Sequence, residues 1–72
     1  GIQLQQAGDL AEYSLKLGSR IFLATGDKEV SSKSLLGILS LGITEGSVIE
    51  VICDGPSEEA DLEQIASFIQ KM

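Results

Sequence analysis

The chain has 72 residues, 43% of them hydrophobic, and a formal net charge of -6 at pH 7. This composition excludes a disordered chain, and the length allows one domain, residues 1–72, with a single thin core. No apolar run approaches the ~20 residues of a membrane span, and the cations are too scattered to bind a phosphate backbone or an anionic membrane. We therefore expect contacts with other proteins rather than with nucleic acid or a membrane. The cations are Lys16, Arg20, Lys28, Lys33 and Lys71.

The first part of the chain predicts a helix preceded by a short extended segment. Residues 2–5 alternate apolar and polar side chains, which favours a strand that is cut short. Residues 6–17 carry small and apolar residues at helical spacing, and Gly18 ends the helix. Gly8 weakens the first turn by about 1 kcal/mol relative to Ala, so a start at the good N-cap residue Asp9 is an alternative. The predicted buried stripe is Ala7, Leu10, Ala11, Ser14 and Leu17.

The middle of the chain predicts a hairpin and a second, shorter helix. Residues 20–31 are typical of two strands joined by a turn at Gly26 and Asp27, because the residues before the turn alternate between two faces. The second helix is expected from residue 32 or 33 to residue 41, where Gly42 provides a stop.

The last part predicts a strand and a third helix. Residues 47–54 form the strongest predicted strand, and we expect Cys53 to be buried there as a central-strand residue, since no second Cys or His could share a metal with it. A lone thiol also fits a reducing cytoplasm. Ser57 is expected to cap the third helix, whose predicted buried stripe is Leu62, Ile65, Ala66 and Ile69. We expect its acidic residues, Glu58, Glu59, Asp61 and Glu63, to form a solvated face.

The order helix–strand–strand–helix–strand–helix predicts an α+β open-faced sandwich, with helices packed on one face of a mostly antiparallel sheet. The first strand is expected to be short or missing. Strand 47–54 would then have an open edge, which invites pairing with a second chain and therefore a homodimer.

The segments "KSLLGILSLGI" (residues 33–43) and "EGSVIEVICDG" (residues 45–55) resemble the histidine-containing phosphocarrier (HPr) family of the sugar phosphotransferase system. The resemblance implies an HPr-like fold and places the family's regulatory serine at Ser34, at the start of the second helix. In members of that family from Gram-positive bacteria of the Firmicutes type, a dedicated HPr kinase phosphorylates this serine, and the product can act as a corepressor for a catabolite-control transcription factor. The resemblance also implies that Leu35, Leu36 and Leu39, with Lys33 beside them, dock onto partner proteins.

The same comparison exposes a difference at the family's phosphorylated histidine. Its motif, Gly-(Ile/Leu)-His-Ala-Arg-Pro, corresponds here to residues 1–6, so Gln3 stands at the histidine position and Gln5 at the arginine position. A neutral carboxamide cannot accept a phosphoryl group as an imidazole nitrogen does. The catabolite-repression HPr (Crh) subgroup also has glutamine in place of the histidine, and this chain is loosely similar to it.

Plainer interpretations stand beside these. Ser34 could be a helix cap only, and Ser31 or Ser32 could cap equally well. The three leucines could belong to the core, although not every apolar residue of so short a helix can face one sheet; Ile38 and Leu41 are the better core candidates.

We find no nucleophile–base pair, Gly-rich phosphate loop or metal cluster, and therefore expect neither an enzyme nor a bound cofactor or metal. The sequence favours a non-catalytic, regulatory HPr-like protein that works through protein–protein contacts, with Ser34 phosphorylation as a gate. The expected partners are an HPr kinase, a catabolite-control transcription factor or phosphotransferase-system components. The alternative is a structural or oligomerisation module that uses the open strand edge.

Overall fold

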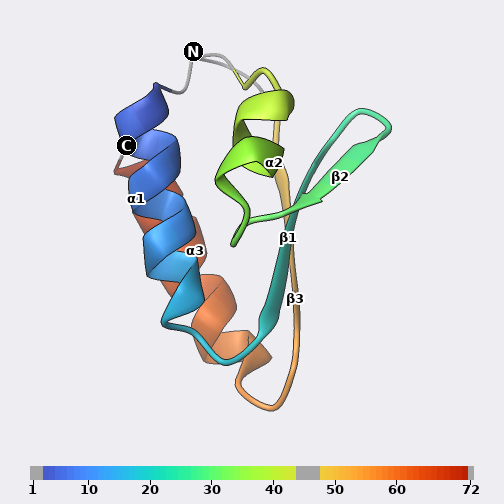
Figure 1. Ribbon diagram of the computed structural model, residues 1–72. Helices are drawn as coiled ribbons and strands as arrows, with labels where there is room; N and C mark the ends of the chain where they lie inside the picture. Colours follow the sequence, from blue (N-terminus) through green and yellow to red (C-terminus); the bar gives the residue numbers. More distant parts are fainter. Residues whose placement is uncertain (1–2, 44–47, 72) are drawn as a thin grey trace.

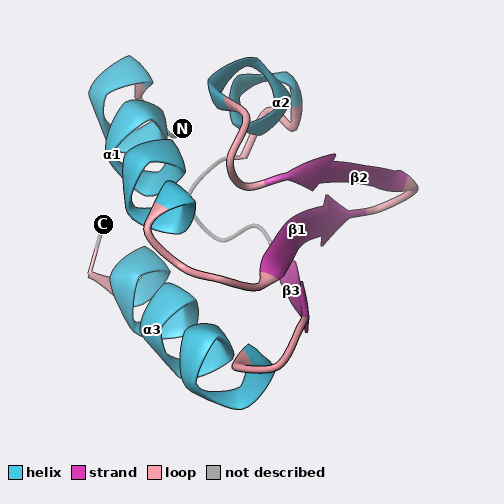
Figure 2. Cartoon of the chain, turned by 60° about the horizontal axis from the view of Figure 1, so that its bottom comes forward, coloured by secondary structure: helices cyan, strands magenta, loops and turns pink. Residues whose placement is uncertain are grey.

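The computed structural model describes residues 3–43 and 48–71. Its elements are α1 (Leu4–Leu15), β1 (Arg20–Thr25), β2 (Lys28–Ser31), α2 (Leu35–Ser40), β3 (Glu50–Asp54) and α3 (Glu58–Gln70). This is the expected order, and the helices cover one face of the sheet (Figures 1 and 2). The predicted α+β sandwich is therefore confirmed.

The sheet has the strand order β2-β1-β3, and both pairings are antiparallel. Leu23 on the central strand lies opposite Val30 on one side and Val51 on the other. In the described ranges β3 is an edge strand, so the expectation that Cys53 lies in a central strand is wrong. Its side chain is half-buried because only β1 and the helices cover it.

Helix α1 begins earlier than the sequence predicts. Gln3 is its N-cap, the Gln6 Oε1 accepts a hydrogen bond from the Gln3 N–H (3.1 Å), and the Ala7 N–H bonds the Gln3 carbonyl (2.9 Å). These bonds satisfy backbone groups at the start of the helix. The apolar–polar alternation of residues 2–5 is too short to favour a strand over them. Residues 3–5 are therefore not a strand and Asp9 is not an N-cap; residue 2 lies outside the described residues.

The core lies between the helices and the inner face of the sheet. Ser14 and Ser32 are buried beside it: the Ser14 hydroxyl donates to the Leu10 carbonyl, and the Ser32 hydroxyl donates to the Ser14 Oγ (both 2.8 Å). This bond ties the segment before α2 to α1. The core residues are Ala7, Leu10, Ala11, Ile21, Leu23, Ile38, Leu41 and Ile65, which confirms Ile38 and Leu41 as core.

Helix α3 is rotated relative to its predicted stripe. Asp61 is only 4% exposed, whereas Leu62 is 40% exposed, so the predictions of a solvated Asp61 and a buried Leu62 are both wrong. Asp61 and Ile65, one turn apart, face inward together. The Asp61 Oδ2 accepts hydrogen bonds from the Ser19 N–H (3.0 Å) and from the Ser57 hydroxyl (2.8 Å). Ser57 is the N-cap residue, but its side chain bonds this carboxylate rather than the helix backbone.

Candidate functional site

Helix α2 begins at an exposed serine. Ser34 is the N-cap in an extended conformation, and its Oγ accepts a hydrogen bond from the Gly37 N–H (3.1 Å). Its carbonyl accepts the Ile38 N–H (3.0 Å), which is the first backbone bond of the helix. The predicted start at residue 32 or 33 is therefore two or three residues too early, because Ser34 supplies the cap and α2 begins at Leu35.

The three serines before α2 differ in accessibility. Ser32 is fully buried and its hydroxyl bonds Ser14, so neither a solvent-borne enzyme nor a partner can reach it. Ser31 is half-buried, and its Oγ accepts a bond from the Lys33 N–H (3.2 Å). Ser34 is the exposed one of the three. Ser34 can cap α2 and still be accessible, because its Oγ lies at the exposed N-terminal end of the helix.

Two of the three predicted docking leucines point outward. Leu36 is 78% exposed and Leu35 is 37% exposed, while Leu39 is half-buried and packs against the core. Helical geometry accounts for the difference, because Ile38 occupies the inward face of this short helix and Leu39 lies beside it. We call Ser34, Leu35, Leu36 and the outer edge of Leu39 the α2 patch.

Lys33 is less available than its sequence position suggests. It is half-buried, and its Nζ donates a hydrogen bond to the Leu17 carbonyl (3.3 Å), just past the end of α1. A cation at the C-terminal end of a helix is favourable because the last carbonyls carry partial negative charge. Lys33 therefore links the α2 patch to α1.

Gln3 lies outside the α2 patch, at the N-cap of α1. It is exposed at the start of α1, and α1 and α2 lie side by side in opposite directions (Figure 1). Gln3 is therefore near the C-terminal end of α2, and Ser34 is at its N-terminal end. The structure brings Ser34 and the leucines together, and Gln3 stands apart from them.

Two exposed leucines on α1 were missed by the sequence analysis. Leu4 and Leu15 are each 64% exposed. At about 100° per residue both project on the same flank of α1, beside the buried stripe and away from Tyr13, which faces α3. Because α1 contacts α2 on its other side, this flank borders the α2 patch. The sequence feature that could have revealed them is their helical position, which lies next to, but outside, the buried stripe of Ala7, Ala11 and Ser14.

Metal binding and thiol chemistry find little support in the described residues. Residues 3–43 and 48–71 hold no group of three His, Cys, Asp or Glu side chains able to bind a metal. Burial raises the pKa of the Cys53 thiol, and the negative charges of Asp61 and Glu58 raise it further, which favours the protonated thiol over the thiolate. In the same ranges no helix is both long and apolar enough to cross a bilayer.

Comparison with known proteins identifies the family of this chain. A family model described as the PTS HPr component phosphorylation site matches residues 1–71. The chain belongs to the HPr family. It is an HPr-like protein related to the phosphotransferase system, as the motif around Ser34 predicts.

The HPr-like protein Crh of Halalkalibacterium halodurans is 34% identical over 71 residues, covering 99% of this chain and 84% of that protein. The crystal structure of Crh, a catabolite-repression protein of Bacillus subtilis, matches with a TM-score of 0.92 at 30% identity, over 99% of this chain and 82% of that one. It is described as a dimer with a swapping domain. The phosphocarrier HPr of Bacillus anthracis matches with a TM-score of 0.89 at 32% identity, over 94% and 81% of the two chains.

Proposed function

We propose that this HPr-like protein is a regulator that acts by protein–protein contact at the α2 patch and does not carry a phosphoryl group on a histidine. The observation that carries the proposal is Ser34. It is exposed, it caps α2, and it stands directly before two exposed leucines. A partner can therefore read a charge on the serine and an apolar surface in one contact.

Phosphorylation of Ser34 would change this surface strongly. A phosphate adds about -1.5 to -2 charges at neutral pH, and a partner with an Arg or Lys cluster can bind it with charge-assisted hydrogen bonds. Leu35 and Leu36, together with Leu4 and Leu15 on α1, offer the apolar contact. The proposed partners are an HPr kinase, a catabolite-control transcription factor or other components of the phosphotransferase system, which the relatives' role in catabolite repression supports.

The loss of phosphocarrier chemistry follows from the residues present. The chain contains no histidine. The resemblance to the family motif assigns the phosphorylated position to Gln3, whose neutral amide is not a nucleophile for phosphoryl transfer. Gln3 instead serves as the N-cap of α1. What remains for the protein is recognition by its surface.

The test is incubation with an HPr kinase and ATP, followed by mass measurement of the intact chain and of its peptides. We expect the mass of one phosphoryl group, located on Ser34. Ser34→Ala should take up none, whereas Ser40→Ala, which changes an exposed serine at the other end of α2, should be modified like the wild type. An unmodified chain, or phosphate on another serine, would rule out the gate.

A second candidate function is oligomerisation through β3. Within the described residues the outer edge of β3 pairs with no strand, and Val48 just before it is 87% exposed. Exposed strand edges pair readily with other chains. The dimeric relative with a swapping domain supports this candidate.

Light scattering distinguishes the two candidates. If the protein is a dimer that dissociates on Val48→Pro or Glu50→Pro, the edge is its working surface, since proline removes a hydrogen-bond donor from the ladder. If these variants leave the association state and the Ser34 reaction unchanged, the regulatory proposal stands without the edge.

A further inference from the structure

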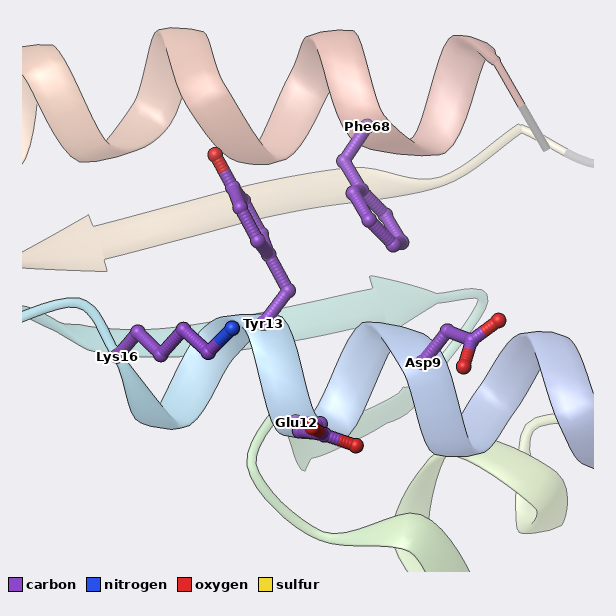
Figure 3. Close-up of a pocket in the computed structure, with 5 residues that line it drawn as sticks. All are labelled: Asp9, Glu12, Tyr13, Lys16 and Phe68. Carbon is purple, nitrogen blue, oxygen red and sulfur yellow. The ribbon is translucent and has the colours of Figure 1, made fainter.

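A groove lies between α1 and α3, on the side of these helices that faces away from the sheet (Figure 3). At its centre the rings of Tyr13 and Phe68 stack with their centroids 4.7 Å apart and an interplanar angle of 13°. The Tyr13 hydroxyl donates a hydrogen bond to the Gln64 Oε1 (2.8 Å), which fixes the ring across the two helices. Both rings are half-buried, so each also presents area to solvent.

The stack is bordered by two hollows of about 270 and 280 Å³. The first is lined by Asp9, Glu12 and Lys16 of α1 in addition to the rings, and the second mainly by residues of α3 that include Glu63 and Lys71. Because both hollows include Tyr13 and Phe68, they form one continuous surface with an aromatic centre and a charged rim. Aromatic centres with polar rims are typical of protein–protein contact surfaces.

The rim charges form a regular pattern. α1 and α3 run in opposite directions, with the start of α1 and the end of α3 at the same end of the molecule (Figure 1). Asp9 and Lys71 therefore lie at one end of the groove, and Lys16 and Glu63 lie at the other. Asp9 and Lys16 are seven residues apart and Glu63 and Lys71 eight, so each pair spans about 10–12 Å along its helix. Each end thus carries one acid and one base, and the signs on α1 and α3 are reversed.

This pattern is complementary to itself. In a two-fold symmetric pair each patch meets its own copy. If the axis runs across the helices, Asp9 meets the Lys16 of the second copy and Glu63 meets its Lys71. If the axis runs along the helices, Asp9 meets the second copy's Lys71 and Lys16 meets its Glu63. Opposite charges face each other in both arrangements, and the aromatic stacks meet at the centre; Glu12, near the middle, is the one rim charge without a counterpart.

The other cations of the chain are engaged elsewhere. Arg20 forms an ion pair with Asp54, the Lys28 Nζ donates to the Ser40 carbonyl, and the Lys33 Nζ donates to the Leu17 carbonyl. Although the chain as a whole is acidic, the groove thus holds cations and carboxylates in near balance. This balance favours a second copy over a strongly basic or strongly acidic partner.

We propose that the groove between α1 and α3 is a self-association surface, in which the Tyr13–Phe68 stack and its charged rim pack against the same surface of a second copy. It involves neither the α2 patch nor the edge of β3, so it leaves both free in the dimer.

Sedimentation equilibrium on the full chain tests the proposal. We expect a reversible dimer. Lys16→Glu should raise its dissociation constant about tenfold or more, because the two-fold axis makes each lost attraction occur twice in the dimer. The matched control is Lys28→Glu, which changes the net charge equally but lies far from the groove, and should have a smaller effect. Circular dichroism confirms that both variants fold.

Charge-swap variants keep the net charge unchanged and provide the decisive experiment. Asp9→Lys with Lys16→Glu restores complementarity only when the axis runs across the helices, and Lys16→Glu with Glu63→Lys restores it only when the axis runs along them. Recovery of the dimer by one of the two swaps supports the proposal and selects the arrangement. A monomeric wild type, equal effects of the Lys16 and Lys28 variants, recovery by neither swap, or a dimer broken only by Val48→Pro would overturn it.

Discussion

Asp61 is a carboxylate placed inside the protein by hydrogen bonds. Its Oδ2 accepts bonds from the Ser19 N–H and the Ser57 hydroxyl, and so joins the start of β1 to the start of α3. The polar Ser19 side chain beside the carboxylate and then the Ser57 hydroxyl lower the pKa of Asp61 by favouring its charged form, against the opposing effect of burial, and the Ser19 N–H bond lowers it further. From the sequence Asp61 is expected to be solvated like Glu58 and Glu59, because charged side chains are rarely buried; the structure leaves those two exposed and buries Asp61.

The lowered pKa of Asp61 predicts a pH dependence of stability. Since the group is more acidic in the folded state, its contribution is present above the unfolded pKa of about 3.9 and is lost as the pH falls through the lower folded value. Asp61→Asn should therefore be less stable than the wild type at neutral pH, and the difference should shrink below about pH 4. Urea unfolding across this range measures it.

The control for Asp61 is Glu59→Gln, which removes an exposed carboxylate of the same helix without touching the buried bonds. The bonds to Ser19 and Ser57 do not carry the effect if the stability difference between wild type and Asp61→Asn stays constant down to acid pH. The same conclusion follows if Glu59→Gln shows the same pH-dependent loss of stability as Asp61→Asn.

The Ser34 cap makes a second prediction at this scale. Ser34→Ala removes the acceptor for the Gly37 N–H and should cost about 1 kcal/mol of unfolding free energy, whereas Ser34→Asp retains an acceptor and should cost less than half as much. Urea denaturation provides the values. Equal losses for both variants would show that the hydroxyl, rather than an acceptor at the N-cap, stabilises α2.

At the scale of elements, the junctions decide where each helix sits. Ser32 fixes the approach to α2 by bonding Ser14 of α1, and Asp61 fixes the start of α3. Gly55 lies at the turn from β3 into α3, where an added Cβ would be 3.1 Å from the Ser19 Cα. Gly8, by contrast, lies inside α1 with nothing within 4 Å of an added Cβ.

The two glycines should respond to alanine with opposite signs. Gly8→Ala should stabilise the protein by about 1 kcal/mol, because alanine is the better helix former and meets no neighbour. Gly55→Ala should destabilise it by about 1–3 kcal/mol, because backbone atoms must shift. Thermal and urea unfolding of both variants checks this, and the same sign for both would contradict the described course of the chain at one of the glycines.

At the scale of the whole molecule, periodicity and turn residues were sufficient to predict the order of elements, the hairpin and most of the core. Local patterns could not give the start of α1 or the rotation of α3, because the Gln3–Gln6 bond and the buried Asp61 depend on side-chain partners that spacing does not reveal. For the site, the motif predicted Ser34, Leu35 and Leu36 as neighbours at the surface. It missed Leu4 and Leu15, which join them only through the packing of α1 beside α2.

The central claim is that this HPr-like protein acts by recognition and not by phosphoryl transfer. The most direct measurement is incubation with phosphoenolpyruvate and the general first enzyme of the phosphotransferase system, with an HPr that carries the histidine as positive control. We predict no label on this chain while the control is fully labelled, because Gln3 offers no nucleophilic nitrogen. Label that appears on the chain and passes to a sugar-specific component would contradict the account.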